Sequence, residues 1–241
     1  MHRFYIYPTD TLTETTITIR SEEFRHMVQV LRMKVGDEFF AFNGNGYTYT
    51  ARITSIDKKE LTAKISSKKL NPADPTKTLT VFHGLSKGEK MELVAQKITE
   101  LGASALVAFE SKYSNVTAKT HKVERLEKIC ISASKQCGRS TLVQTGEILT
   151  LPQIADKLSK YDFTIVFYEK EQIETISNVV DAYPKANNVA IIVGPEGGFA
   201  PEEIALLEER GAKVCTLGKR ILRTETASIA ATAIIANFMK I

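Results

Sequence analysis

Two glycine-bearing loops near the end of the chain carry the polar residues best suited to hold a ligand. The first is GPEGG (194–198), which follows an apolar run and precedes a segment with helical character. Gly197 and Gly198 permit positive φ and a close approach of the backbone to a ligand, and Pro195 fixes the loop. Glu196 adds a carboxylate, which repels phosphate and suits a cation or a ribose hydroxyl.

The second loop is LGKRILRTETAS (217–228), which also follows a strand-like run and opens a helix-like one. Ile221 and Leu222 are apolar in an otherwise polar loop, and Arg223 lies near the expected start of the helix. Ligands of open α/β sheets bind beyond the carboxyl ends of the strands, so two such loops predict one adenosine-like site. The pattern is neither a Rossmann fingerprint nor a Walker loop, because Gly-x-Gly-x-x-Gly and Gly-Lys-Ser/Thr are both absent.

An alternation of strands and helices brings these loops together. Strand-like runs occur at 79–85, 105–109, 163–168, 189–193 and 213–218. Amphipathic or apolar helices are expected at 90–102, 122–138, 201–211 and 226–239, with Thr224 or Thr226 as the cap of the last one. Strands that are apolar throughout, alternating with helices, predict an α/β domain with a mostly parallel sheet.

The first 70 residues have a different pattern, dominated by short β segments. TTITI (15–19) alternates with the period of a half-buried strand, and residues 37–56 predict a hairpin around two Asn-Gly steps. A strand at 60–69 follows, and SEEFRHMVQVLRM (21–33) predicts a short helix capped by Ser21. Short strands around one small helix predict a compact β-barrel, which ends at the proline-containing segment 68–78.

Composition and charge limit the possible functions. Hydrophobic residues make up 43% of the 241 residues and charged residues 25%, which is ordinary for a globular protein. The three cysteines form no Cys-x-x-Cys pair, and the first residues lack the apolar core of a signal peptide, so we expect a cytoplasmic protein without a metal site. Residues 1–70 hold 11 Lys/Arg against 8 Asp/Glu, and residues 112–139 hold seven against two. These regions are either ordinary solvated surface or a surface that binds a polyanion such as a nucleic acid.

The two loops, in this order, resemble the RsmE family of 16S ribosomal RNA uridine methyltransferases in the SPOUT superfamily. HRFY at the start, FRHMVQVLRMKVGD (24–37), KGEKMELVAQKITELG (87–102) and ASKQCGRS (133–140) follow the family's order. One departure is Tyr113, which stands where similar sequences tend to carry an arginine.

The resemblance implies a fold that periodicity alone does not predict. It implies a PUA-like β-barrel that binds RNA over residues 1–70 and a SPOUT methyltransferase domain over 71–241, with a C-terminal trefoil knot. It also implies a homodimer, S-adenosylmethionine as the cofactor, and methylation of ring nitrogen 3 of a uridine in 16S RNA of the small ribosomal subunit.

The resemblance, the charge pattern and the chemistry of the uracil proton together assign site residues in three groups. Cofactor contacts are assigned to Tyr168, Glu169, Gly194, Pro195, Glu196, Gly197, Leu217, Gly218, Ile221, Leu222 and Thr226. Arg223 is expected to stabilise charge on the uracil, and Glu196 is a second catalytic candidate, as a base or as a ribose ligand. Contacts to RNA are assigned to Arg3, His26, Arg32, Lys122, Arg125, Gln136 and Arg139.

Several alternatives remain open on the sequence. A nucleotide-binding transferase that acts on small molecules explains the loops but not the N-terminal barrel. A non-catalytic ribosome-assembly module explains the barrel and the charge but not the paired loops. Arg223 could also serve only in an ion pair with Glu225, and a lone histidine such as His26 is more often structural.

Overall fold

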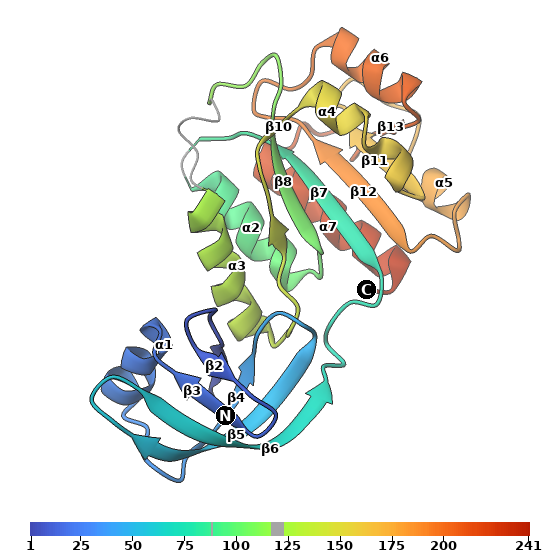
Figure 1. Ribbon diagram of the computed structural model, residues 1–241. Helices are drawn as coiled ribbons and strands as arrows, with labels where there is room; N and C mark the ends of the chain where they lie inside the picture. Colours follow the sequence, from blue (N-terminus) through green and yellow to red (C-terminus); the bar gives the residue numbers. More distant parts are fainter. Residues whose placement is uncertain (88, 117–122) are drawn as a thin grey trace. The chain divides into compact units, whose positions relative to one another are not determined.

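The computed structural model describes residues 1–87, 89–116 and 123–241, and it divides into two compact units (Figure 1). Unit 1 comprises Met1–Asp74 and Ser134–Leu142, and unit 2 comprises Pro75–Ala133 and Val143–Ile241. The boundary expected at residue 70 lies just before the first change of unit. The return of Ser134–Leu142 to unit 1 was not foreseen, because no local pattern distinguishes these residues from the helix before them.

Unit 1 is built on a curled six-stranded sheet. Its strands are β1 (Arg3–Tyr5), β2 (Thr11–Leu12), β3 (Thr16–Ile19), β4 (Glu38–Phe42), β5 (Tyr47–Ile56) and β6 (Leu61–Leu70), in the order β1-β4-β5-β6-β3-β2. Only the β1–β4 pair is parallel. The predicted hairpin is confirmed as β4 and β5, and Gly44 and Gly46 take φ values of 90° and 84° in its turn. Phe4, Phe39 and Met27 lie in the core that the curled sheet encloses.

The short helix of unit 1 differs from the prediction in its details. It consists of α1 (Glu22–Arg25) followed by a π-helical turn, η1 (His26–Val30). Ser21 occupies the N-cap position, but its hydroxyl donates to Asp10 Oδ2 at 2.9 Å and makes no cap bond. Glu23 is buried, and its carboxylate forms an ion pair with Lys135, with 2.6 Å between Oε1 and Nζ.

Unit 2 is built on a sheet in which every described strand pair is parallel. Its strands are β7 (Thr78–Gly84), β8 (Ala105–Glu110), β9 (Gln144–Thr145), β10 (Leu149–Thr150), β11 (Phe163–Phe167), β12 (Asn188–Val193) and β13 (Lys213–Cys215). The order is β10-β8-β7-β12-β11-β13, and β9 also pairs with β8. The mostly parallel sheet predicted from the apolar strands is therefore confirmed.

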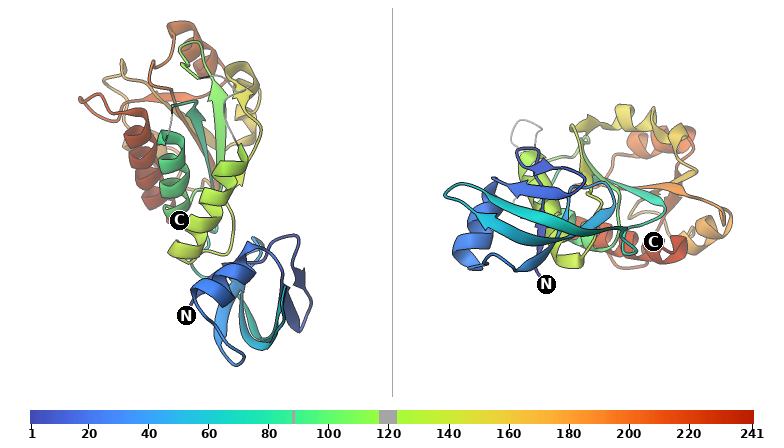
Figure 2. Two further views of the ribbon diagram at one scale, coloured as in Figure 1. Left: turned by 90° about the vertical axis from the view of Figure 1, so that its left-hand side faces the viewer. Right: turned by 60° about the horizontal axis from the view of Figure 1, so that its bottom comes forward.

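Helices cover both faces of this sheet (Figure 2). The elements are α2 (Lys90–Glu100), α3 (Val123–Cys137), α4 (Leu151–Ala155), η3 (Leu158–Lys160), α5 (Ile176–Asp181), α6 (Pro201–Glu209) and α7 (Thr224–Met239). Residues of α2, α3, α5 and α7 share one apolar core with the strands, and residues of α4 and α6 share the other. Helices α2 and α7 lie side by side, and α7 is buried along most of one face.

Candidate ligand site and nucleic-acid contacts

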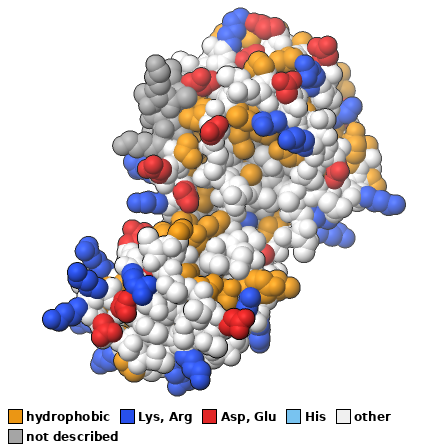
Figure 3. Space-filling view, viewed as in Figure 1, with side chains coloured by type: hydrophobic (Ala, Val, Ile, Leu, Met, Phe, Trp, Pro, Cys, Tyr) orange, Lys and Arg blue, Asp and Glu red, His pale blue; other side chains and the backbone are white. Residues whose placement is uncertain are grey.

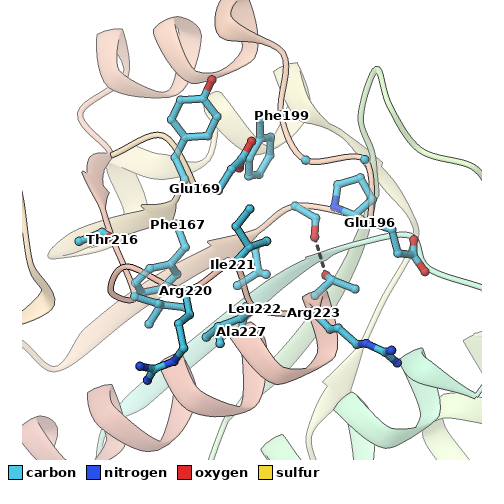
Figure 4. A pocket seen from close by; sticks show the side chains of 18 of the residues that line it. Phe167, Glu169, Glu196, Phe199, Thr216, Arg220, Ile221, Leu222, Arg223 and Ala227 are labelled. Atoms are coloured by element: carbon cyan, nitrogen blue, oxygen red, sulfur yellow. Dashed lines mark hydrogen bonds between the residues drawn. The ribbon is translucent and has the colours of Figure 1, made fainter. Parts of the chain in front are cut away.

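The carboxyl ends of three neighbouring strands surround a cavity of about 530 Å³ in unit 2 (Figure 4). Its walls come from the loops after β11, β12 and β13 and from the first turn of α7. Adjacent parallel strands end at the same edge of the sheet, so segments far apart in the chain converge there. Of the predicted ligand contacts, those that line the cavity are Tyr168, Glu169, Gly194, Pro195, Glu196, Gly197, Leu217, Gly218, Ile221 and Leu222. Arg223, expected to act in catalysis, lines it as well.

The loop after β12 is fixed by backbone contacts that require glycine. A Cβ on Gly84 would lie 2.3 Å from the backbone nitrogen of Pro195, so only glycine lets β7 and this loop meet. A Cβ on Gly197 would lie 2.6 Å from the carbonyl oxygen of Tyr113. The close approach at Gly197 is thus made to the protein, and a larger residue there would disturb the fold as well as a ligand.

The loop after β13 supplies the apolar part of the wall. Leu217 and Leu222 pack against the core, whereas Ile221 lines the cavity and is 85% exposed. Gly218 has φ of 105°, and no atom lies within 4 Å of the position that a Cβ would take there. Its requirement for glycine is therefore purely conformational.

The start of α7 corrects the cap that was expected there. The N-cap position is Arg223, without a side-chain cap bond, and Thr224 is the first residue of the helix. The Thr224 hydroxyl donates to the carbonyl oxygen of Gly194 at 2.5 Å and so joins the two glycine loops (Figure 4). Thr226, predicted as a cofactor contact, is exposed and is not among the residues that line the cavity.

A lysine that the sequence did not single out meets Glu196. Lys90, at the start of α2, lines the cavity and its Nζ lies 3.0 Å from Glu196 Oε1. Burial by itself raises the pKa of this carboxyl, but bonds from Lys90 and from the amides of Glu196 and Lys87 outweigh it and lower the pKa. A carboxylate with a lowered pKa is a poor proton acceptor, which argues against Glu196 as a general base.

Two further charged residues of the cavity have no such pairing within the described residues. Glu169 makes no ion pair there, and its carboxylate oxygens would lie 3.2 and 3.4 Å from a Cβ on Gly198. Arg223 is exposed and forms no ion pair with Glu225 in the described ranges. Figure 4 shows Arg223 extending on the side of Glu196 and Arg220 on the opposite side. The alternative of an Arg223–Glu225 ion pair therefore finds no support.

The residues expected to contact RNA are in differing environments. His26, Arg32 and Gln136 are at least partly exposed in unit 1, and Arg32 has an unusual positive φ of 54°. Arg3 donates to Thr48 Oγ1 at 3.0 Å and to Ser140 Oγ at 2.5 Å.

The remaining residues predicted to contact RNA give less support for a contact to an RNA phosphate. Arg139 is only 3% exposed, which argues against that role. Arg125 is exposed in unit 2, but its Nε lies 2.7 Å from Glu92 Oε1. Lys122 lies outside the described residues. Figure 3 shows Lys and Arg side chains spread over unit 1, with acidic residues between them.

The described part of the chain holds neither a cluster of metal ligands nor a membrane-spanning helix. No group of three or more His, Cys, Asp or Glu side chains is arranged there to hold a metal ion. Every helix in the described ranges is too short or too polar to cross a bilayer.

Comparison with known proteins shows similarity over almost the whole chain. A family model described as RNA methyltransferase domain matches residues 73–236, and one described as RNA methyltransferase PUA domain matches residues 19–66. Ribosomal RNA small subunit methyltransferase E of Bacillus subtilis is 31% identical over 98% of this chain and 96% of its own length.

Solved structures are similar over the same extent. A crystal structure of ribosomal RNA small subunit methyltransferase E from Neisseria gonorrhoeae, bound to S-adenosyl methionine, is 30% identical with a TM-score of 0.88. The match covers 98% of this chain and 97% of that one. A putative methyltransferase from Legionella pneumophila in complex with the same cofactor is 30% identical with a TM-score of 0.86, over 98% and 96% of the two chains.

Proposed function

The chain belongs to the ribosomal RNA small subunit methyltransferase E family, and we propose that its cavity binds S-adenosylmethionine for methylation of 16S ribosomal RNA. The methylated atom is ring nitrogen 3 of a uridine, and the product is 3-methyluridine. The observation that carries the proposal is the single cavity formed by the two glycine loops. The family and the fold class predicted from the sequence are confirmed, while the trefoil knot stays a prediction.

The cavity residues fit this cofactor. A volume of about 530 Å³ lies within the usual range for small-molecule sites. The exposed Ile221 and the packed Leu217 and Leu222 offer an apolar surface for a purine ring, next to backbone groups of Gly218. Glu169 and Glu196 offer carboxylates to hydroxyl groups or to a positive charge. A site for a nucleotide phosphate would instead offer bare backbone amides or lysine side chains in place of these carboxylates.

Methyl transfer requires mainly that the protein position the cofactor and the uracil. When bound, S-adenosylmethionine supplies a methyl group on a positively charged sulfur. The residues of this chain have to hold the uracil nitrogen in line with that methyl group and manage the proton that nitrogen 3 carries at neutral pH. Arg223, at the cavity and without a carboxylate partner in the described ranges, is placed to stabilise negative charge on the uracil oxygens as this proton leaves to water. Glu196, paired with Lys90, serves as a ligand contact in this proposal.

RNA binding is assigned to both parts of the chain. We assign residues 1–70 to a PUA-like RNA-binding domain and residues 71–241 to the methyltransferase domain, in accord with the matches at 19–66 and 73–236. His26, Arg32 and Gln136, which are at least partly exposed, are retained as RNA contacts, as is the basic helix that carries Arg125. The substrate in this proposal is 16S RNA within the small ribosomal subunit, in the cytoplasm.

The surface of α7 supports the proposal of a homodimer. Ala230, Ile234 and Phe238 recur every four residues and form one stripe, in which Ile234 is 38% and Phe238 39% exposed. Leu93 of the neighbouring helix α2 is 41% exposed. Burial of these side chains against a second copy would remove apolar surface from water.

Transfer of a labelled methyl group tests the function. Purified protein, labelled S-adenosylmethionine and small ribosomal subunits lacking the modification should give labelled 16S RNA. Free uridine in place of the subunits should give no labelled product. Labelling of free uridine but not of RNA would favour a transferase that acts on small molecules. Cofactor binding without any transfer would remove the catalytic assignment.

A further inference from the structure

A short turn after β8 is held firmly against the cavity loops. The amide of Ser111 donates to Ser114 Oγ at 2.9 Å, and the amide of Ser114 donates to the Ser111 carbonyl at 3.0 Å. The amide of Lys112 donates to Glu203 Oε1 at 2.8 Å, and its Nζ lies 2.5 Å from Glu202 Oε1. The amide bonds fix the backbone of the turn, and the one from Lys112 joins it to the first turn of α6.

Tyr113, within this turn, sits directly on the loop that lines the cavity. Its carbonyl oxygen and its Cβ would lie 2.6 and 2.7 Å from a Cβ on Gly197. Its ring, however, is not packed away, since the residue is 44% exposed and no hydrogen bond of its hydroxyl is found in the described residues. A rigid backbone therefore presents an aromatic side chain to solvent beside the proposed methyl-donor site.

Cations accompany the exposed ring. Lys112 Nζ lies 5.8 Å from the centre of the Tyr113 ring, within the range of a cation–π contact. The pair of Lys112 with Glu202 has both side chains more than half exposed, so it is weak and can be exchanged for a phosphate. Lys87 is exposed, and its amide donates to Glu196 at 3.4 Å, on the same loop as Gly197. An exposed aromatic ring with a lysine beside it is an arrangement that single-stranded nucleic acid favours.

We propose that Tyr113 is a stacking platform for an RNA base next to the methyl-donor cavity, with Lys112 as a contact for the adjoining phosphate. The proposal rests on the proposed function, since it concerns the RNA substrate of that site. Base–aromatic stacking is tolerant of sequence, so Tyr113 would hold the strand in place while other groups select the uridine. Tyr113 is thus assigned as a positioning residue of the RNA.

A fluorescent substitution tests the contact itself. The chain contains no tryptophan, so Tyr113→Trp introduces a single fluorophore at this position. A short single-stranded oligoribonucleotide containing uridine should quench its emission in a saturable way. Tyr183→Trp is the matched control, because Tyr183 packs on Phe163 at the start of β11, the opposite end of the strands. Saturable binding by anisotropy of labelled RNA, without quenching at position 113, would overturn the proposal.

Substitutions in the enzyme test the role in catalysis. Tyr113→Ala keeps the backbone and the Cβ that contact Gly197, so affinity for S-adenosylmethionine should stay unchanged in calorimetry. The KM for small ribosomal subunits should rise roughly tenfold, as expected for one lost stacking contact. Tyr113→Phe, which keeps the ring, should restore the wild-type KM.

The outcomes separate this proposal from the proposed function. Equal KM values for Tyr113→Ala and the wild type would refute the stacking role while leaving the methyltransferase assignment intact. Absence of methylation by the wild-type protein would refute the proposed function, and the quenching of Tyr113→Trp by RNA would still decide whether a base stacks there.

Discussion

The ammonium group of Lys90 and the carboxylate of Glu196 form an ion pair, 3.0 Å apart, at the edge of the cavity between α2 and the loop after β12. The two residues are 106 positions apart in the chain. The pair joins the first of the two glycine loops to the start of a helix from an earlier part of unit 2. Within the pair, the ammonium group of Lys90 offsets the negative charge of Glu196, one of the two carboxylates that line the cavity.

The pH dependence of this pair can be measured. Glu196 has a lowered pKa in the folded chain, so its contribution to stability is present at neutral pH and is lost as pH falls through that lowered value. Lys90→Met removes the cation, so the pKa of Glu196 should rise and the loss of stability in acid should become smaller. Lys87→Met is the control, because Lys87 contributes only its backbone amide. Titration of Glu196 by carbon NMR checks this; equal pKa values in Lys90→Met and the wild type would contradict the ion pair.

Ile221 provides a test of the cofactor site that spares the fold. The residue is 85% exposed, so Ile221→Ala should leave the melting temperature unchanged. If a purine packs on it, affinity for S-adenosylmethionine should fall roughly 5- to 20-fold, about 1–2 kcal/mol of lost apolar contact. Ile173→Ala is the matched control, since Ile173 is also 85% exposed and does not line the cavity. Calorimetry that gives the same affinity for both variants would remove Ile221 from the site.

Arg223 is predicted to act in methyl transfer and not in folding. Arg223→Lys keeps a positive charge but loses the planar guanidinium, which can donate two parallel hydrogen bonds. Because Arg223 is exposed and has no ion pair with Glu225 in the described ranges, the melting temperature should stay near that of the wild type. Single-turnover methylation at saturating cofactor should slow at least roughly tenfold, or about 1.4 kcal/mol of barrier. A normal rate would exclude the catalytic role, and a large drop in melting temperature would indicate a structural one.

The stripe on α7 predicts the oligomeric state. Sedimentation at micromolar concentration should show a species near twice the chain mass of 26.8 kDa. Phe238→Glu places a charge in the stripe and should give monomers, because an unpaired buried charge is costly. Val35→Glu is the control, since Val35 is 60% exposed in unit 1. A monomeric wild type would contradict the proposed homodimer.

Salt and charge reversal test the basic helix. RNA affinity should fall steeply as salt rises, because phosphate contacts release counterions. Changing Lys122, Arg125 and Lys128 to Glu should weaken RNA binding and leave cofactor affinity intact. The control is a second triple variant with the same change in net charge, in which Glu replaces Lys157, Lys160 and Lys185. Equal RNA binding by the two triple variants would identify the basic helix as ordinary solvated surface.

The sequence predicted most of the regular elements but few of the contacts between them. Apolar runs such as 189–193 and the glycines that end several helices have a local cause, so their strands and helix ends were predicted correctly. Thr224, by contrast, looked like a cap, and only the fold shows its hydroxyl reaching Gly194, 30 residues away.

The predictions for the cavity had the same limit, because contacts between distant segments were missed. Eleven of its residues were predicted: nine from the two glycine loops, whose residues lie close together in the chain, and Tyr168 and Glu169 from the resemblance to a family. Lys90 and the Tyr113–Gly197 contact were missed, because neither periodicity nor turn chemistry encodes which distant residue a loop will meet.

Mass mapping of the methylated RNA tests the proposed uridine methylation most directly. Small ribosomal subunits lacking the modification would be incubated with the protein and S-adenosylmethionine, and nuclease fragments of 16S RNA would be sequenced by mass spectrometry. We predict one uridine that gains 3-methyluridine, and loss of this product in a variant that no longer binds the cofactor. A methyl group on a different base, on the ribose, or on no RNA at all would contradict the proposed function.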